Sequence, residues 1–107
     1  MTAYAVAHMR HVTPGPWMAD YLARIDATLA PFCGRFVVHG GPVEVVENEW
    51  PGHLIVIEFR GRHHVRGCYN SPAYQANLKL RTDNSDSDVI FVDGVEHPHK
   101  ATDVLAD

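Results

Sequence analysis

Two stretches of the chain have the length of β-strands and are apolar at nearly every position. They are 53–59 (HLIVIEF) and 89–92 (VIFV). A strand with apolar side chains on both faces has to be buried on both faces. The rest of the pattern supplies helices for only one face of a sheet, so the other face needs a second cover. A second copy of the same chain is the simplest cover, and we therefore expect a homodimer.

The segments around these strands alternate between strand and helix patterns. AYAVAHM at 3–9 and RFVVH at 35–39 predict two further strands, and VEVVENE at 43–49 is compatible with a short one. Between the first two lies an amphipathic helix with Trp17, Tyr21, Ile25 and Leu29 at intervals of four. The order β-α-β-(β)-β-α-β predicts the α+β class: a ferredoxin-like split βαβ protomer with an antiparallel sheet.

Local signals set the expected helix ends. Thr13 is a candidate cap for the first helix, Pro31 ends it, and Gly34 is expected to take the left-handed conformation after it. A second helix is expected from about 62 to 70. Ser71 followed by Pro72 predicts a cap and the first residue of a third helix.

Composition excludes several classes of function. The 107 residues carry a formal net charge of -4, which argues against a nucleic-acid partner. The longest apolar run is far short of the roughly 20 residues that a membrane span needs. Neither a signal-peptide pattern nor a pair of closely spaced cysteines is visible, so we expect a cytoplasmic protein with free thiols.

Four blocks of the sequence resemble one known family. They are GRFVVHGG (34–41), LIVIEF (54–59), YNSPAYQANLKLR (69–81) and VIFVDGV (89–95). In this order they are similar to the domain-of-unknown-function 1330 family of the dimeric α/β-barrel superfamily. The resemblance implies a ferredoxin-like protomer over 1–95 whose sheet packs on that of its mate, with 96–107 left as a polar C-terminal tail. It implies no activity, although the wider superfamily includes cofactor-free monooxygenases, lactone isomerases and haem-binding enzymes.

Candidate site residues come from both lines of reasoning. A cleft between sheet and helices would be lined by Tyr4, His8, His39, Tyr69, Asn70 and Arg81. The resemblance adds Ser87, which matches a serine that follows the arginine in the family. It also adds His53, which like His39 stands where similar sequences often carry arginine. Several of these residues also have a purely structural interpretation: Tyr69 and Asn70 as contacts at a helix break, Arg81 as a helix-end cation, and His39 and His53 as strand-end histidines.

Two hypotheses for function follow. In the first, the chain is a cofactor-independent enzyme. Its cleft binds a small planar or acidic organic compound, and His39 or His8 acts on this compound as the general base. In the second, the chain is a non-catalytic dimeric binding or interaction module. No nucleotide-binding fingerprint or metal-ligand spacing is visible, so no cofactor and no metal site are expected.

Overall fold

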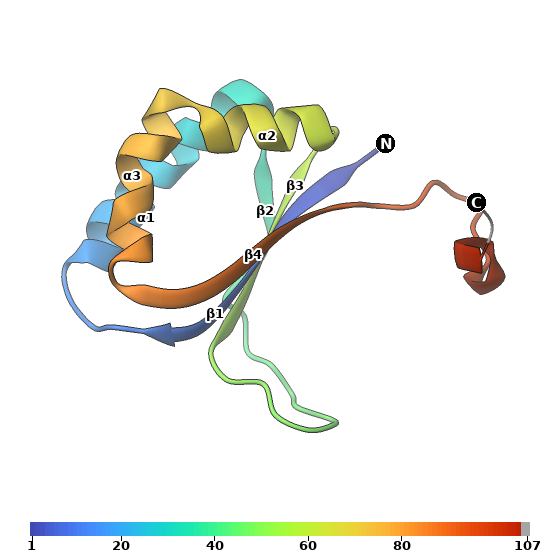
Figure 1. The fold of residues 1–107 in the computed structure, drawn as a ribbon, viewed down its shortest axis with the longest axis horizontal. Helices are drawn as coiled ribbons and strands as arrows, with labels where there is room; N and C mark the ends of the chain where they lie inside the picture. Colours follow the sequence, from blue (N-terminus) through green and yellow to red (C-terminus); the bar gives the residue numbers. More distant parts are fainter. Residues whose placement is uncertain (106–107) are drawn as a thin grey trace.

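The computed structural model describes residues 1–105 (Figure 1). Within them the elements follow in the order β1 Ala3–Val12, α1 Trp17–Leu29, a 3-10 turn Ala30–Phe32, β2 Arg35–His39, β3 His53–Phe59, α2 Arg62–Asn70, α3 Pro72–Thr82, β4 Ser85–Asp93 and a second 3-10 turn Ala101–Leu105. The strands form one antiparallel sheet in the order β2-β3-β1-β4. This is the ferredoxin-like split βαβ arrangement that the order of elements predicts.

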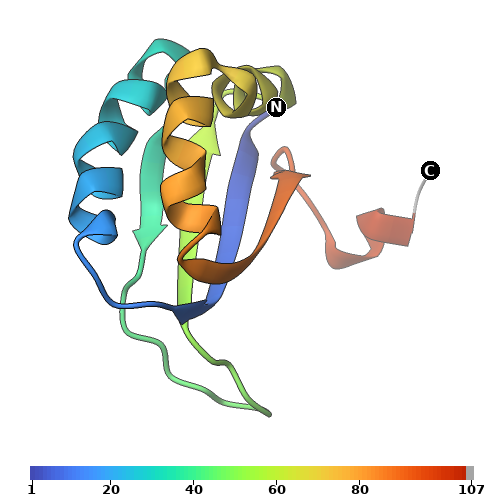
Figure 2. The ribbon, with the colours of Figure 1, turned by 60° about the vertical axis from the view of Figure 1, so that its left-hand side comes forward.

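The helices form a single layer on one face of the sheet. Helices α1 and α3 lie side by side along that face, and α2 crosses its end near the chain's N-terminus (Figure 2). No helix within the described residues covers the opposite face, which we call the outer face. None of the helices in this part of the chain is long and apolar enough to cross a membrane.

The register of β1 decides which side chains face the helices. Ala3, Ala5, Ala7 and Met9 point to the helix layer, because Ala3 belongs to the buried core and successive side chains alternate. Their partners on β3 and β4 share that face, so it is paved by rows such as Phe91–Ala5–Ile57. The even-numbered residues of β1 from Tyr4 to His8 point to the outer face. The register shifts between Met9 and His11, and beyond this shift Val12 faces the helix layer.

The buried core gathers at the end of the sheet that α2 covers. Ala3 and Phe59 meet Ile25 and Leu29 of α1 and Val65 of α2 there. Gly34 is needed at this place, because a Cβ atom on it would lie 2.6 Å from the ring of Phe59. The packing of the core therefore constrains the connection between α1 and β2.

Two details at the ends of α1 differ from the expectation. Thr13 does not cap the helix: the residue before α1 is Pro16, and the carbonyl of Thr13 instead accepts a hydrogen bond from the Trp17 indole at 2.6 Å. After the helix, Cys33 and not Gly34 adopts the left-handed conformation, with φ of 59°. The close approach to Phe59 is what requires glycine at position 34.

The connection between β2 and β3 also differs. The expected strand at 43–49 is absent from the structure, and the 40–52 segment is a long loop that projects beyond the sheet (Figures 1 and 2). Trp50 anchors it by stacking on His8, with ring centroids 4.0 Å apart.

The chain leaves the sheet soon after β4. The Gly94 amide donates to the carbonyl of Thr2 at 2.7 Å, and the chain then runs away from the domain (Figure 1). Val104 and Leu105 in the second 3-10 turn are largely exposed. The last two residues of the expected tail, Ala106 and Asp107, lie outside the described residues.

Candidate functional site: a cavity between helices and sheet

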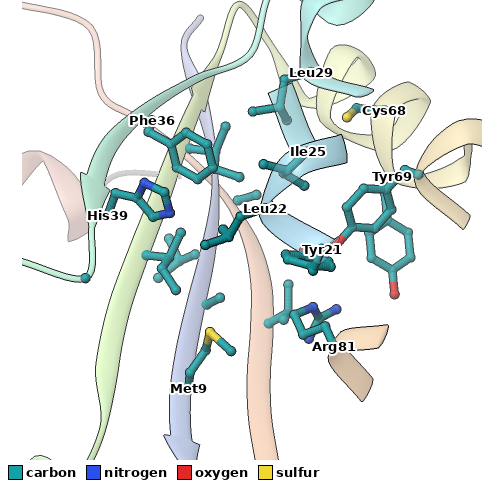
Figure 3. A pocket seen from close by; sticks show the side chains of 18 of the residues that line it. Met9, Tyr21, Leu22, Ile25, Leu29, Phe36, His39, Cys68, Tyr69 and Arg81 are labelled. Atoms are coloured by element: carbon teal, nitrogen blue, oxygen red, sulfur yellow. Dashed lines mark hydrogen bonds between the residues drawn. The ribbon is translucent and has the colours of Figure 1, made fainter. Parts of the chain in front are cut away.

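A cavity of about 290 Å³ separates the helix layer from the sheet (Figure 3). It begins at the buried core and runs toward the end of the sheet where Met9 pairs with His53. On the sheet side of the cavity, the central strand β1 carries only the small side chains of Ala5 and Ala7, which leave space above them. Larger side chains at these positions would fill the space beneath Leu22 of α1. The volume is at the low end of the range of ligand pockets, roughly 300–1,000 Å³.

Arg81 is the buried charge of this cavity. Its side chain lies in the cavity wall near the end of α3, and the residue is only 7% exposed. No carboxylate within residues 1–105 forms an ion pair with it. Burial by itself lowers the pKa of Arg81, but the neighbouring Tyr74 and Tyr21 outweigh this effect and raise it. The guanidinium therefore stays charged in a largely apolar cavity.

Two tyrosine hydroxyls stand beside that cation. Tyr21 of α1 and Tyr74 of α3 lie with their oxygens 3.3 Å apart, and both residues line the cavity. Burial, followed by the proximity of Tyr74, raises the pKa of Tyr21 well above its usual value. The hydroxyl of Tyr21 thus stays protonated at neutral pH and can donate a hydrogen bond. Together the three groups form a cluster suited to an anionic oxygen.

The break between α2 and α3 positions one side of this cluster. Ser71 caps α3 by accepting a hydrogen bond from the Tyr74 amide at 3.2 Å, and its own hydroxyl donates to the Cys68 carbonyl at 2.7 Å. Tyr69 before the break and Tyr74 after it both line the cavity, with ring centroids 5.3 Å apart. The helix break thus presents two aromatic rings to one space.

Further hydrogen bonds hold the backbone around the cluster. Asn77 is buried between the two long helices, and its Nδ2 donates to the Tyr21 carbonyl at 3.1 Å. The Ser85 hydroxyl donates to the Arg81 carbonyl at 2.7 Å and lies 2.9 Å from the hydroxyl of Ser87. Ser87 therefore supports the arginine from outside the cavity and does not line it.

His39 and His53 stand on the far side of the cavity from Arg81. Both line it from adjacent strands, and both side chains are also exposed to solvent. The His39 ring is stacked on Phe36 with centroids 3.9 Å apart and planes 9° apart. Figure 3 shows His39 and Arg81 at opposite sides of the space.

Three other predicted site residues lie elsewhere. Tyr4 and His8 are on the outer face of β1, because they have the opposite parity from Ala5 and Ala7. His8 is engaged there, with its Nε2 2.6 Å from the Pro51 carbonyl oxygen. Asn70 is exposed at the end of α2 and is not among the residues that line the cavity. The structure thus brings His39, His53, Tyr69 and Arg81 to one cavity and leaves Tyr4, His8, Asn70 and Ser87 out of it.

Tyr21 was not among the predicted site residues. It belongs to the apolar stripe of α1, which the helical spacing assigns to packing alone. Its hydroxyl was the available signal, since a buried tyrosine needs a partner for its O–H.

Metal ligands do not gather in the part of the chain that the structure describes. No three histidine, cysteine, aspartate or glutamate side chains of residues 1–105 come close enough to hold one ion. The cavity lining also contains no carboxylate.

Comparisons with solved structures show the same fold in several proteins, one of which is described as dimeric. A protein of unknown function from Rhodopseudomonas palustris has a TM-score of 0.65 at 16% identity, covering 89% of this chain and 83% of that one. A dimeric ferredoxin-like protein of unknown function from a Jannaschia species has a TM-score of 0.68 at 9% identity, covering 88% of this chain and 100% of that one. SnoaB, a cofactor-independent oxygenase from Streptomyces nogalater, has a TM-score of 0.58 at 15% identity, covering 92% and 97%.

These likenesses are at low identity and establish the fold alone. No curated protein matches the chain. A family model does match, and it spans residues 2–95, from the start of β1 to just beyond β4. The resemblance seen in the four sequence blocks is thereby confirmed: the chain belongs to the domain of unknown function (DUF1330) family.

Proposed function

We propose that the cavity binds a small, flat, largely apolar organic acid, and that Arg81 holds the anionic group of this compound. The observation that carries the proposal is a buried guanidinium that has no carboxylate partner among residues 1–105 and lies next to two tyrosine hydroxyls in an apolar space. An unpaired buried charge is costly, and an incoming anion that pairs with it recovers part of that cost.

The same cavity suits chemistry without a cofactor. Arg81, Tyr21 and Tyr74 would stabilise negative charge that develops on a substrate oxygen. His39 at the opposite side is the candidate general base, since its ring reaches the cavity and no hydrogen-bond partner engages it within the described residues. His8, the other candidate base, faces away from this space. The fold likeness to a cofactor-independent oxygenase is compatible with this proposal.

We also propose that the chain works as a homodimer joined through its outer faces. One row across that face is apolar on all four strands: Val38, Val56, Val6 and Ile90. Val38 and Ile90 are exposed in the single chain. Ion pairs flank the row on both sides, Arg35 with Glu58 at 2.6 Å and Arg10 with Asp88 at 2.9 Å. An apolar centre with a polar rim is the usual anatomy of a protein interface.

Binding of matched ligands tests the cavity proposal. We expect 2-naphthoate to bind more tightly than the neutral 2-naphthamide, as measured by calorimetry. Charge-assisted hydrogen bonds contribute about 1.5–3 kcal/mol each, so the difference should be roughly tenfold or more. Arg81→Met should abolish the preference, whereas Arg81→Lys should keep part of it.

Arg24→Met is the matched control, because Arg24 is an exposed arginine on α1 that does not line the cavity. It should leave both affinities unchanged. Equal binding of acid and amide by the wild-type protein would overturn the proposal. So would an Arg81→Met variant that is folded by circular dichroism and still prefers the acid.

A further inference from the structure

The cavity has a second polar end besides the Arg81 cluster. His39 on β2 pairs with Ile55 of β3, and His53 lies two residues before Ile55 on the same face. The two imidazoles are therefore diagonal neighbours on adjacent strands, within reach of one ligand group. Neither has an ion-pair or side-chain hydrogen-bond partner among the described residues, so both are free to bind one.

An apolar stretch separates the two ends. Ala7 and Ile55, which pair across β1 and β3, line the sheet side between them. Leu22 and Ile25 of α1 line the helix side (Figure 3). His39 lies on one edge strand of the sheet, and Arg81 lies at the end of α3 that leads into the other edge strand. Three strand spacings of roughly 4.8 Å separate those edges. A molecule that touches both ends must be elongated, with a polar group at each end and an apolar body between them.

The charges around the histidines favour an anion at their end as well. The titratable groups that share the cavity with them are Arg81, Tyr21, Tyr69, Tyr74 and Cys68, none of which is a carboxylate. The acidic side chains of the 40–52 loop, Glu44, Glu47 and Glu49, surround a separate hollow beside Leu54. A ligand carboxylate next to His39 and His53 would thus meet no acidic side chain in the cavity.

We propose that the natural ligand is an elongated aromatic or alicyclic diacid, with one carboxylate at Arg81 and the second at His39 and His53. This rests on the proposed function, because it assumes that the first carboxylate binds at Arg81. The two ends differ in kind. The Arg81 end is buried and permanently charged, whereas the histidine end is open to solvent and carries positive charge only when its imidazoles are protonated.

Calorimetry with a matched pair of acids tests this inference. The compounds are 2,6-naphthalenedicarboxylate and 2-naphthoate, which share the apolar body and differ in one carboxylate. At pH 5.5 the diacid should bind about tenfold more tightly or better, because both imidazoles can form charge-assisted hydrogen bonds. At pH 8 the advantage should shrink to a few-fold. The monoacid, measured at both pH values, reports any effect of pH on the Arg81 end.

Variants assign the effect to the histidines. His39→Gln together with His53→Gln should remove the advantage of the diacid at pH 5.5, so that the double variant binds the diacid and 2-naphthoate with similar affinity. His63→Gln is the control, since His63 is an exposed histidine on α2 outside the cavity lining. It should preserve the advantage.

The outcomes separate the two proposals. If 2-naphthoate binds in an Arg81-dependent way but the second carboxylate brings no gain at pH 5.5, the diacid inference is wrong and the proposed function stands. A gain that survives the double histidine substitution also overturns the inference. If neither acid depends on Arg81, the proposed function itself fails.

Discussion

Single residues set the chemistry of the cavity, and their environments differ sharply. Arg81 is buried and charged, Tyr21 is half-buried and protonated, and His39 and His53 are exposed. Sequence reasoning placed Arg81, Tyr69, His39 and His53 at a common site, and these four do line one cavity. It placed Tyr4 and His8 there too, because a strand pattern shows alternation but not which parity faces the helices.

Cys68 illustrates how burial lowers the reactivity of a thiol. Burial raises the pKa of its thiol to about 11, and its Sγ donates to the Thr28 carbonyl at 3.3 Å. At pH 8 only about 0.1% of it is thiolate. Cys33 is exposed. Titration of the native protein with a thiol reagent at pH 8 should therefore label one cysteine per chain, and the second should react only after denaturation.

Cys33→Asn is the matched control for that titration, because asparagine tolerates the left-handed backbone of position 33. It should leave the native protein unlabelled. Rapid labelling of two thiols in the native wild-type chain would show that Cys68 is accessible.

At the scale of elements, local signals were reliable where a residue type forces the backbone. Ser71 and Pro72 placed the α2–α3 break correctly, since proline disfavours helix at the residue before it. The short strand that was possible at 43–49 is not formed, although Val43, Glu44 and Val45 alternate there. Alternation alone does not supply a neighbouring strand, and the pairing of β2 with β3 ends at His39.

Ser71→Ala tests the importance of the break. Loss of the cap should lower the free energy of unfolding by about 1 kcal/mol, because the Tyr74 amide loses its acceptor. Ser71→Thr keeps the hydroxyl and should lose much less. Denaturant unfolding of all three proteins at one protein concentration measures the difference. An unchanged midpoint and slope for Ser71→Ala would mean that the cap contributes nothing.

At the scale of the whole molecule, the apolar outer face is the strongest reason to expect a partner chain. The sequence predicted such a partner from strands that are apolar on both faces. The single layer of helices covers only one face of the sheet, so the outer face is left uncovered within one chain. A cleft between sheet and helices was expected from the sequence, but its size could not be predicted, because it depends on how far α1 and α3 stand from Ala5 and Ala7.

Val6→Asp tests the proposed interface. Val6 lies in the centre of the apolar row, so two copies of the substitution would place carboxylates in a desolvated contact. Light scattering at micromolar concentration should give a dimer mass for the wild-type chain and a monomer or aggregate for Val6→Asp. Ala23→Asp, on the exposed side of α1, should stay dimeric. A wild-type monomer under these conditions contradicts the proposal.

Deleting the residues after Val95 tests the proposed extent of the domain. The tail buries little of its apolar surface, since Val104 and Leu105 are 74% and 81% exposed. Its removal should change the free energy of unfolding by about 1 kcal/mol or less. The number of chains in the assembly should stay the same. A loss of several kcal/mol, or dissociation, would instead identify the tail as an arm docked on the partner.

The alternation along β1 has a consequence for how such a chain can vary over evolution. From position 3 to position 9, odd positions face the helix layer and even positions form the outer face, so one inserted or deleted codon in this part of the strand would exchange the two surfaces from that point onward. Point substitutions at positions 5 and 7 change only the cavity. They can alter ligand preference while the outer face stays the same. We therefore expect insertions and deletions among homologues to be excluded from β1 and to accumulate in the 40–52 loop.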